Sequence, residues 1–289
     1  MTMSRRSFLR SSATAVAGVA LLRDLLAEDI SGAPRAVKIR IGSRTGSFGG
    51  KIERARECGL QGVELGVGGA ADRLEISNPD KRAKYKEAVK AVGIVVSSLS
   101  MDLMNGYPVA REPRAVAWLG QCIDAAKDLG ATAILVPFFG KAELLDSHKE
   151  FKKADVDAVV ACMKEVAPRA KDADVHLGIE STLTAKQYLE LLDRIGSEYV
   201  GAYYDIGNCT RAGYDVPGDI KALKDRISMI HFKDGSNFLG EGRVRLEPVA
   251  EALKAIDYKS WIILETACPT NNALADAKKN VDTIRKLGL

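Results

Sequence analysis

The chain has 289 residues, with 42 Lys and Arg against 38 Asp and Glu, and a formal net charge of +4 at pH 7. This charge is close to neutral for the size of the chain, and no basic run is interleaved with aromatic residues, so the sequence gives no support to nucleic-acid binding. No stretch after the first residues reaches the length of a membrane span, so we expect no stable membrane anchor once the N-terminal segment is removed.

The first 33 residues have the composition of an export signal. "SRRSFLR" (Ser4 to Arg10) contains paired arginines and precedes the uncharged run "SSATAVAGVALL" (Ser11 to Leu22). That run is too short and too rich in small residues for a mature membrane helix. Paired arginines followed by an uncharged apolar run resemble a twin-arginine signal peptide. We therefore expect residues 1–33 to be cleaved and the mature protein to be periplasmic or secreted.

Residues 34–289 alternate short apolar runs with amphipathic segments. Eight runs are predicted as strands: KIRIGSR from Lys38, GVELG from Gly62, IVVSSLSM from Ile94, TAILVPFF from Thr132, HLGIES from His176, VGAYYDIG from Val200, SMIHFKD from Ser228 and SWIILETA from Ser260. A helix-like segment follows each run, from KIERARECG at Lys51 to ALADAKKNVDTIRKLG at Ala273. Eight such pairs predict an α/β fold, a (β/α)8 TIM barrel in a single domain. An open doubly wound sheet is the alternative, but no GxGxxG turn follows the first strand.

Polar residues end the last four predicted strands on the inward phase: Glu180, Asp205, His231 and Glu265. In a TIM barrel the active site lies at the C-terminal ends of the strands. Three carboxylates meeting in a partly dry cavity raise one another's pKa unless a cation neutralises them. We therefore expect these four residues to bind one divalent metal ion. Three oxygen donors and one imidazole favour Mn²⁺, Mg²⁺ or Co²⁺, with Zn²⁺ as the alternative.

Five motifs carry a resemblance to a known family. "LGIES", "YYDIGN", "IHFKDG", "LGEGRV" and "IILET" occur in the order and spacing of the xylose-isomerase-like TIM barrels, a superfamily of sugar and sugar phosphate isomerases and epimerases. The resemblance covers essentially the whole chain after residue 33. It implies that Glu180, Asp205, His231 and Glu265 bind one divalent metal. In the ketose 3-epimerase branch it also implies that Glu180 and Glu265 are the catalytic proton-transfer pair.

The sequence departs from that family at Asn208. Many sugar epimerases have a substrate-holding His three residues after the Asp of the sixth strand, the position of Asn208 here. An Asn side chain can hydrogen-bond a sugar hydroxyl, but it cannot shuttle a proton or carry charge. The departure weakens the assignment to a simple ketose epimerase and leaves the predicted metal site intact.

Three residues in addition to Asn208 are candidate substrate contacts. Glu64 shares the inward phase of the second strand and can contact substrate or complete a hydrogen-bond network. Lys233 lies two residues after His231 on the same face, where it can hold an anionic oxygen or pair with a nearby acid. Arg243, in the loop after the seventh strand, can recognise a carboxylate-bearing substrate or offset local acids.

The leading functional hypothesis is a divalent-metal-dependent isomerase or epimerase of a free sugar or related polyol. A metal that chelates a hydroxyl and an adjacent carbonyl acidifies the C–H bond between them, and a glutamate on each face can remove and return the proton. A free sugar is favoured because sugar phosphates are scarce outside the cytoplasm and no glycine loop cradles a phosphate. The expected partner is a small-molecule carbohydrate, and the sequence is compatible with a homo-oligomer.

Three other functions are weighed against it. The same proton abstraction followed by elimination gives a lyase or dehydratase acting on a 3-keto-glycoside or an inosose, which is the second hypothesis. A non-catalytic sugar-binding protein ranks below it, because the Glu, Asp, His, Glu set is retained. An abasic-site endonuclease of the same fold needs a three-metal cluster with several histidines, and this chain contains only three histidines in all.

Overall fold

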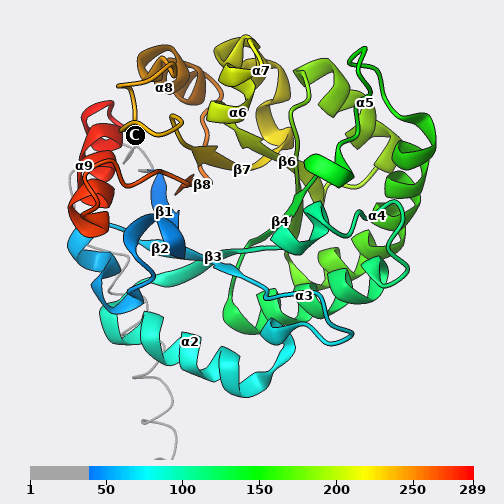
Figure 1. Cartoon of the computed structure of the whole chain (residues 1–289), viewed down its shortest axis with the longest axis horizontal. Coiled ribbons are helices and arrows are strands. Elements are labelled where there is room, and N and C mark those ends of the chain that lie inside the picture. The colour runs from blue at the N-terminus through cyan, green and yellow to red at the C-terminus, as the bar shows by residue number, and fades with distance from the viewer. Residues whose placement is uncertain (1–38) are drawn as a thin grey trace, which may run out of the picture. The chain divides into compact units, whose positions relative to one another are not determined.

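The computed structural model describes residues 39–289, and the predicted signal peptide lies outside these residues. Within them, neighbouring parallel strands pair in chain order until β8 meets β1, which closes the barrel (Figure 1). The predicted single-domain TIM barrel is confirmed. The strands are β1 (Arg40–Arg44), β2 (Gly62–Gly66), β3 (Val95–Ser100), β4 (Ala133–Pro137), β5 (His176–Glu180), β6 (Val200–Asp205), β7 (Ile227–Phe232) and β8 (Trp261–Leu264).

Helices form the outer ring around the strands (Figure 1). The α-helices are α2 (Pro79–Val92), α3 (Ala115–Leu129), α4 (Lys153–Ala173), α5 (Ala185–Ile195), α6 (Ile206–Arg211), α7 (Val216–Leu223), α8 (Leu246–Ala255) and α9 (Ala273–Lys286). The 3-10 helices are η1 (Thr45–Phe48), η2 (Ile52–Cys58), η3 (Glu75–Ser77), η4 (Asp102–Asn105), η5 (Gly140–Ala142) and η6 (Lys224–Arg226). None of the helices in residues 39–289 has both the length and the apolar character needed to cross a membrane.

Local sequence signals explain where several helices begin and end. Thr184 and Gln187 form a reciprocal capping box that starts α5, and Gly196 ends this helix with a positive φ of 71°. The segment predicted as a helix from Lys51 is instead the 3-10 helix η2. Lys51 supplies no side-chain cap to the first turn of this segment, and Gly59 ends it in the left-handed conformation.

The sixth strand is shorter than predicted. Ile206 and Gly207, expected to continue it, instead open α6 directly after Asp205. Asp205 caps this helix, because its Oδ1 accepts a hydrogen bond from the backbone N–H of Asn208 at 2.8 Å. The carboxylate that ends the strand therefore also starts the helix, which holds Asp205 at the rim of the barrel.

Alternate residues of the strands fill the barrel interior, while the residues between them pack against the helices. The interior cluster is separate from the outer core and consists of Ala133, Leu135, Tyr203, Met229, Trp261 and Ile263. Tyr203 and Trp261 are fully buried there. This apolar plug closes the barrel below its C-terminal mouth. The polar residues at the strand ends lie above the plug and line the bottom of the mouth.

Gly62 makes room for the largest side chain of this plug. A Cβ atom at Gly62 would lie 2.7 Å from the Trp261 ring and 3.2 Å from Ser97 Cβ. Gly62→Ala is therefore expected to lower the free energy of unfolding by about 1–3 kcal/mol, the usual cost of overpacking a dense core. Urea denaturation of the variant measures this loss.

Gly69→Ala is the matched control, because nothing lies within 4 Å of a Cβ atom built at Gly69. It should unfold like the unmodified protein. A Gly62→Ala protein as stable as this control would contradict the proposed packing of the barrel interior.

Candidate metal centre and active site

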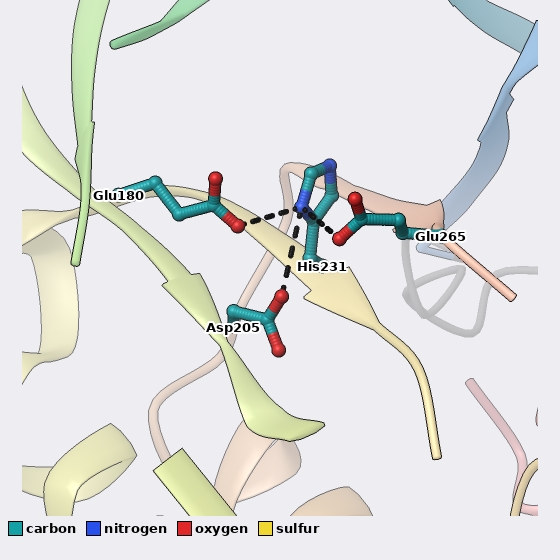
Figure 2. Close-up of side chains that lie close together, drawn as sticks. All are labelled: Glu180, Asp205, His231 and Glu265. Atoms are coloured by element: carbon teal, nitrogen blue, oxygen red, sulfur yellow. Dashed lines mark hydrogen bonds and ion pairs between the residues drawn. The ribbon is translucent and has the colours of Figure 1, made fainter. Parts of the chain in front are cut away.

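Four side chains converge at the C-terminal mouth of the barrel (Figure 2). Glu180 ends β5, Asp205 ends β6, His231 lies one residue before the end of β7, and Glu265 directly follows β8. One potential ligand atom from each residue lies within 4.8 Å of the others. The sequence predicted this convergence from the inward phase of the strands. Register supports it, because Asp205 pairs with His231 across β6 and β7.

One ring nitrogen of His231 faces all three carboxylates. His231 Nδ1 lies 3.0 Å from Glu180 Oε1, 3.3 Å from Glu265 Oε2 and 3.8 Å from Asp205 Oδ2. The imidazole is fully buried, and so is the Asp205 side chain. Nδ1 is therefore the histidine atom placed to share a cation with the carboxylates.

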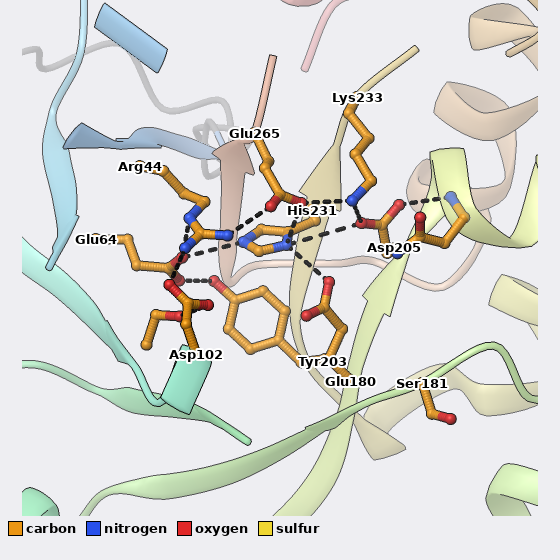
Figure 3. Close-up of polar contacts among 12 residues, drawn as sticks. Arg44, Glu64, Asp102, Glu180, Ser181, Tyr203, Asp205, His231, Lys233 and Glu265 are labelled. Carbon is orange, nitrogen blue, oxygen red and sulfur yellow. Dashed lines mark hydrogen bonds and ion pairs between the residues drawn. The ribbon is translucent and has the colours of Figure 1, made fainter. Parts of the chain in front are cut away.

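The other ring nitrogen of His231 contacts Glu64 of β2 (Figure 3). His231 Nε2 lies 3.2 Å from Glu64 Oε1, while Glu64 Oε2 accepts hydrogen bonds from Tyr203 at 2.6 Å and Ser98 at 2.8 Å. A carboxylate that accepts the Nε2 proton leaves the lone pair of Nδ1 available for a metal. Of the two roles considered for Glu64, the structure shows the hydrogen-bond network; a direct substrate contact stays a prediction.

The residues of the cluster fit a divalent cation. Asp205 Oδ2 is buried and accepts no well-directed hydrogen bond, although Lys233 Nζ lies 2.8 Å away. A buried carboxylate oxygen without a directed donor is uncommon in proteins, and here the ion pair with Lys233 compensates its charge. A metal ion needs no hydrogen-bond angle, and three carboxylates with one imidazole suit a hard or borderline divalent ion.

The two glutamates differ in their affinity for a proton. Burial raises the pKa of Glu180 to about 7, against the opposing effect of His231. Burial also acts to raise the pKa of Glu265, but a hydrogen bond with His231 and the charges of Lys233 and Arg44 outweigh it and lower this pKa. Two carboxylates whose pKa values are pushed apart are typical of an acid and base pair.

Arg44 is a site residue that the sequence analysis missed. It ends β1 and pairs with Glu265 and Asp102, and its Nε lies 3.5 Å from Glu64 Oε1 (Figure 3). The predicted metal site rests on carboxylates and a histidine of the last four strands, whereas Arg44 lies on the first strand. Its inward phase at the end of KIRIGSR, the same signal used for the later strands, points to this site.

Two polar cavities flank the cluster. One, of about 430 Å³, is lined by three of the four predicted substrate contacts, Asn208, Lys233 and Arg243, together with Arg211. The other, of about 470 Å³, is lined by residues of the opposite side of the mouth: Arg44, Thr45, Gly46, Ser47, Glu64, Gly66, Ser100, Asp102, Glu265, Thr266 and Ala267. A small polar molecule lying across the cluster would reach into both cavities.

These features define a class of protein, a TIM barrel with a Glu, Asp, His, Glu cluster at its C-terminal mouth. The xylose isomerase-like TIM barrel family matches residues 52–287. The chain therefore belongs to this family, as the sequence motifs predicted.

Individual relatives are distant. A 2-epi-5-epi-valiolone 7-phosphate 2-epimerase from Actinoplanes is 23% identical over 70% of this chain and 76% of its own length. An L-ribulose-5-phosphate 3-epimerase from Escherichia coli is 25% identical over 74% of this chain and 80% of its own length.

Solved structures share the fold at lower identity. An L-ribulose 3-epimerase has a TM-score of 0.71 at 21% identity and covers 86% of this chain and 94% of its own. A 3-keto-D-glucoside 4-epimerase from E. coli has a TM-score of 0.71 at 14% identity and covers 86% of this chain and all of its own.

The geometry around His231 predicts the effect of neutralising Glu64. Glu64→Gln loses the carboxylate that orients the imidazole, and loss of such an outer partner typically costs about 10- to 100-fold in metal affinity. Titration calorimetry with Mn²⁺ should show this weakening.

Glu57→Gln is the control, since Glu57 is exposed on η2 and pairs only with Arg54 among the described residues. It should bind Mn²⁺ as the unmodified protein does. Equal affinities in the two variants would show that Glu64 does not orient His231.

Proposed function

We propose that this protein is a divalent-metal-dependent isomerase or epimerase of a keto sugar. The observation that carries the proposal is the convergence of Glu180, Asp205, His231 and Glu265 within 4.8 Å at the barrel mouth. Sugar isomerase or epimerase is also the class of enzyme that the relatives support, since the named matches are sugar epimerases.

The two glutamates are placed to move the proton. Glu180 and Glu265 come from β5 and β8 and approach the cluster from opposite sides (Figure 2). A divalent ion bound by the cluster supplies Lewis acidity toward a carbonyl and a neighbouring hydroxyl, which acidifies the C–H bond beside the carbonyl. One glutamate removes the proton from that carbon, and the other returns a proton to the opposite face.

Residues around the pair hold it in position. Arg44 contacts Oε1 of the Glu265 carboxylate, so this carboxylate is fixed in direction. Glu64 and Tyr203 hold the His231 ring from the opposite side of the cluster. Carboxylates and an imidazole held this firmly need little reorganisation when the proton moves.

We propose a free sugar or related polyol as substrate of an exported enzyme. The paired arginines at the N-terminus support export, and export favours a substrate without phosphate. The curated relatives described above are named for sugar phosphates, so the two substrate classes should be compared directly. A kcat/KM that is higher for a ketose phosphate than for the free ketose would overturn this part of the proposal.

A lyase or dehydratase acting on a 3-keto-glycoside or an inosose is the second candidate. Asn208 supports it, because it stands where many epimerases have a histidine. It lines the cavity of about 430 Å³ and accepts a hydrogen bond from Arg211. Elimination begins with the same proton abstraction as epimerisation. It then expels water or an alcohol, whereas epimerisation returns a proton to the carbon. Loss of water or of an alcohol, seen by mass spectrometry of the products, would favour this candidate.

Proton exchange with solvent tests the shared chemical step. Incubation of candidate keto sugars with the Mn²⁺-loaded protein in D₂O should place deuterium on the carbon beside the carbonyl. Glu265→Gln and Glu180→Gln should each slow this exchange by about 10²- to 10⁴-fold, because each removes a group that transfers the proton. NMR of the recovered sugar measures the exchange.

Glu57→Gln again serves as control and should exchange at the normal rate. Exchange that persists in both site variants would contradict the roles of the two glutamates. Absence of exchange with every keto sugar, by a protein that binds metal, would favour the non-catalytic sugar-binding hypothesis.

A further inference from the structure

Lys233 occupies an unexpected position beside the candidate metal centre (Figure 3). Its Nζ atom lies 2.8 Å from Asp205 Oδ2 and 2.6 Å from Glu265 Oε2. These are the same two oxygens that face His231 Nδ1 in the candidate metal cluster. The ammonium group and a metal ion therefore need the same ligand atoms.

The fold is shaped to keep Lys233 in this position. A Cβ atom at Gly207 would lie 2.6 Å from both Lys233 Cγ and the Lys233 carbonyl oxygen. Only glycine at this point of α6 lets the lysine stem pass along the helix to reach Asp205. The side chain is 21% exposed, so most of it is enclosed by the protein.

The neighbouring acid cannot take Lys233 away from the cluster. Asp234 is buried, and its carboxylate accepts hydrogen bonds from the backbone N–H groups of Gly240, Gly242, Arg243 and Val244. These four donors satisfy the Asp234 oxygens and organise the loop after β7. Pairing of Lys233 with a nearby acid was one of its two predicted roles, and the acids that it pairs with are Asp205 and Glu265.

We propose that Lys233 is a built-in competitor of the metal ion, an ammonium that neutralises Asp205 and Glu265 until a divalent cation displaces it. Two cations at contact distance from the same carboxylate oxygens repel each other strongly in a partly buried site. Binding of the ion is therefore expected to drive Nζ away from these oxygens. The cavity of about 430 Å³ that Lys233 itself lines, with Asn208 and Ser236, is the space into which it moves.

This inference rests on the metal centre proposed above and adds a consequence for its affinity. When the binding-competent state is only a fraction of the population, apparent affinity falls by that fraction. Lys233 thus lowers the affinity for metal while it protects the metal-free protein from the repulsion of unpaired buried carboxylates.

Lys233→Met tests the competition, since methionine keeps an unbranched chain and removes the charge. The variant should bind Mn²⁺ about 10-fold more tightly than the unmodified protein, if the lysine occupies the site about nine-tenths of the time. Its metal-free form should melt at a lower temperature than the unmodified metal-free protein, and Mn²⁺ should raise its Tm by more. Calorimetric titration and thermal melts measure these changes without any substrate.

Lys153→Met is the matched control, because Lys153 is 87% exposed on α4 and pairs only with Asp157 among the described residues. It should leave Mn²⁺ affinity unchanged. An affinity for Mn²⁺ that is equal or weaker in Lys233→Met would overturn the inference while leaving the metal centre in place. No binding of Mn²⁺ to the unmodified protein would overturn both.

Chemical labelling tests the displacement in the unmodified chain and does not depend on a variant that folds. Acetylation by N-hydroxysuccinimide acetate, followed by peptide mass spectrometry, reports how accessible Lys233 Nζ is. Adding Mn²⁺ should increase labelling of Lys233 several-fold and leave Lys153 unchanged. Labelling of Lys233 that stays constant or falls with Mn²⁺ would show that the ion does not displace it.

Discussion

The demand for positive charge at the barrel mouth is the constraint on which the rest of the site depends. Four carboxylates, those of Glu64, Glu180, Asp205 and Glu265, surround one fully buried imidazole. Burial of so many acids is stable only when cations or hydrogen-bond donors compensate them. Arg44 and Lys233 supply two of the cations, yet Asp205 Oδ2 still lacks a directed hydrogen bond. A divalent ion in the place of the Lys233 ammonium would be bound directly by Asp205 and Glu265, and this is the physical basis of the proposed metal centre.

The barrel fold positions these charged side chains at its C-terminal mouth. An apolar plug built around Tyr203 and Trp261 fills the interior below the strand ends that carry the cluster. The Tyr203 hydroxyl joins the two regions, because it donates to Glu64 at 2.6 Å while its ring packs against His231. Each member of the cluster thus comes from a rigid strand end, and the loops beyond them shape the flanking cavities. The proposed substrate contacts Asn208 and Arg243 lie outside the four residues of the cluster, so a change at either position can alter substrate preference and leave the proposed metal centre intact.

The sequence predicted the barrel and the convergence of the four polar residues because both depend on periodicity. Alternation along each strand placed Glu180, Asp205, His231 and Glu265 on the inward face. In a closed barrel the inward-facing residues at neighbouring strand ends meet at the mouth. The contacts that periodicity does not encode were missed. The role of Arg44 depends on β1 closing against β8, and the α6 helix depends on Asp205 acting as its cap. The pairing of Lys233 with Asp205 and Glu265, and not with Asp234, depends on four backbone donors of a loop whose path the sequence did not reveal.

Metal content of the purified protein tests the central claim most directly. Inductively coupled plasma mass spectrometry after reconstitution with Mn²⁺, Co²⁺ or Zn²⁺ should find close to one ion per chain. His231→Ala and Glu265→Gln should lose most of it, because each removes a ligand from the cluster. An unmodified protein that retains none of these ions would contradict the account, since the four residues would then be a structural charge network and not a metal centre.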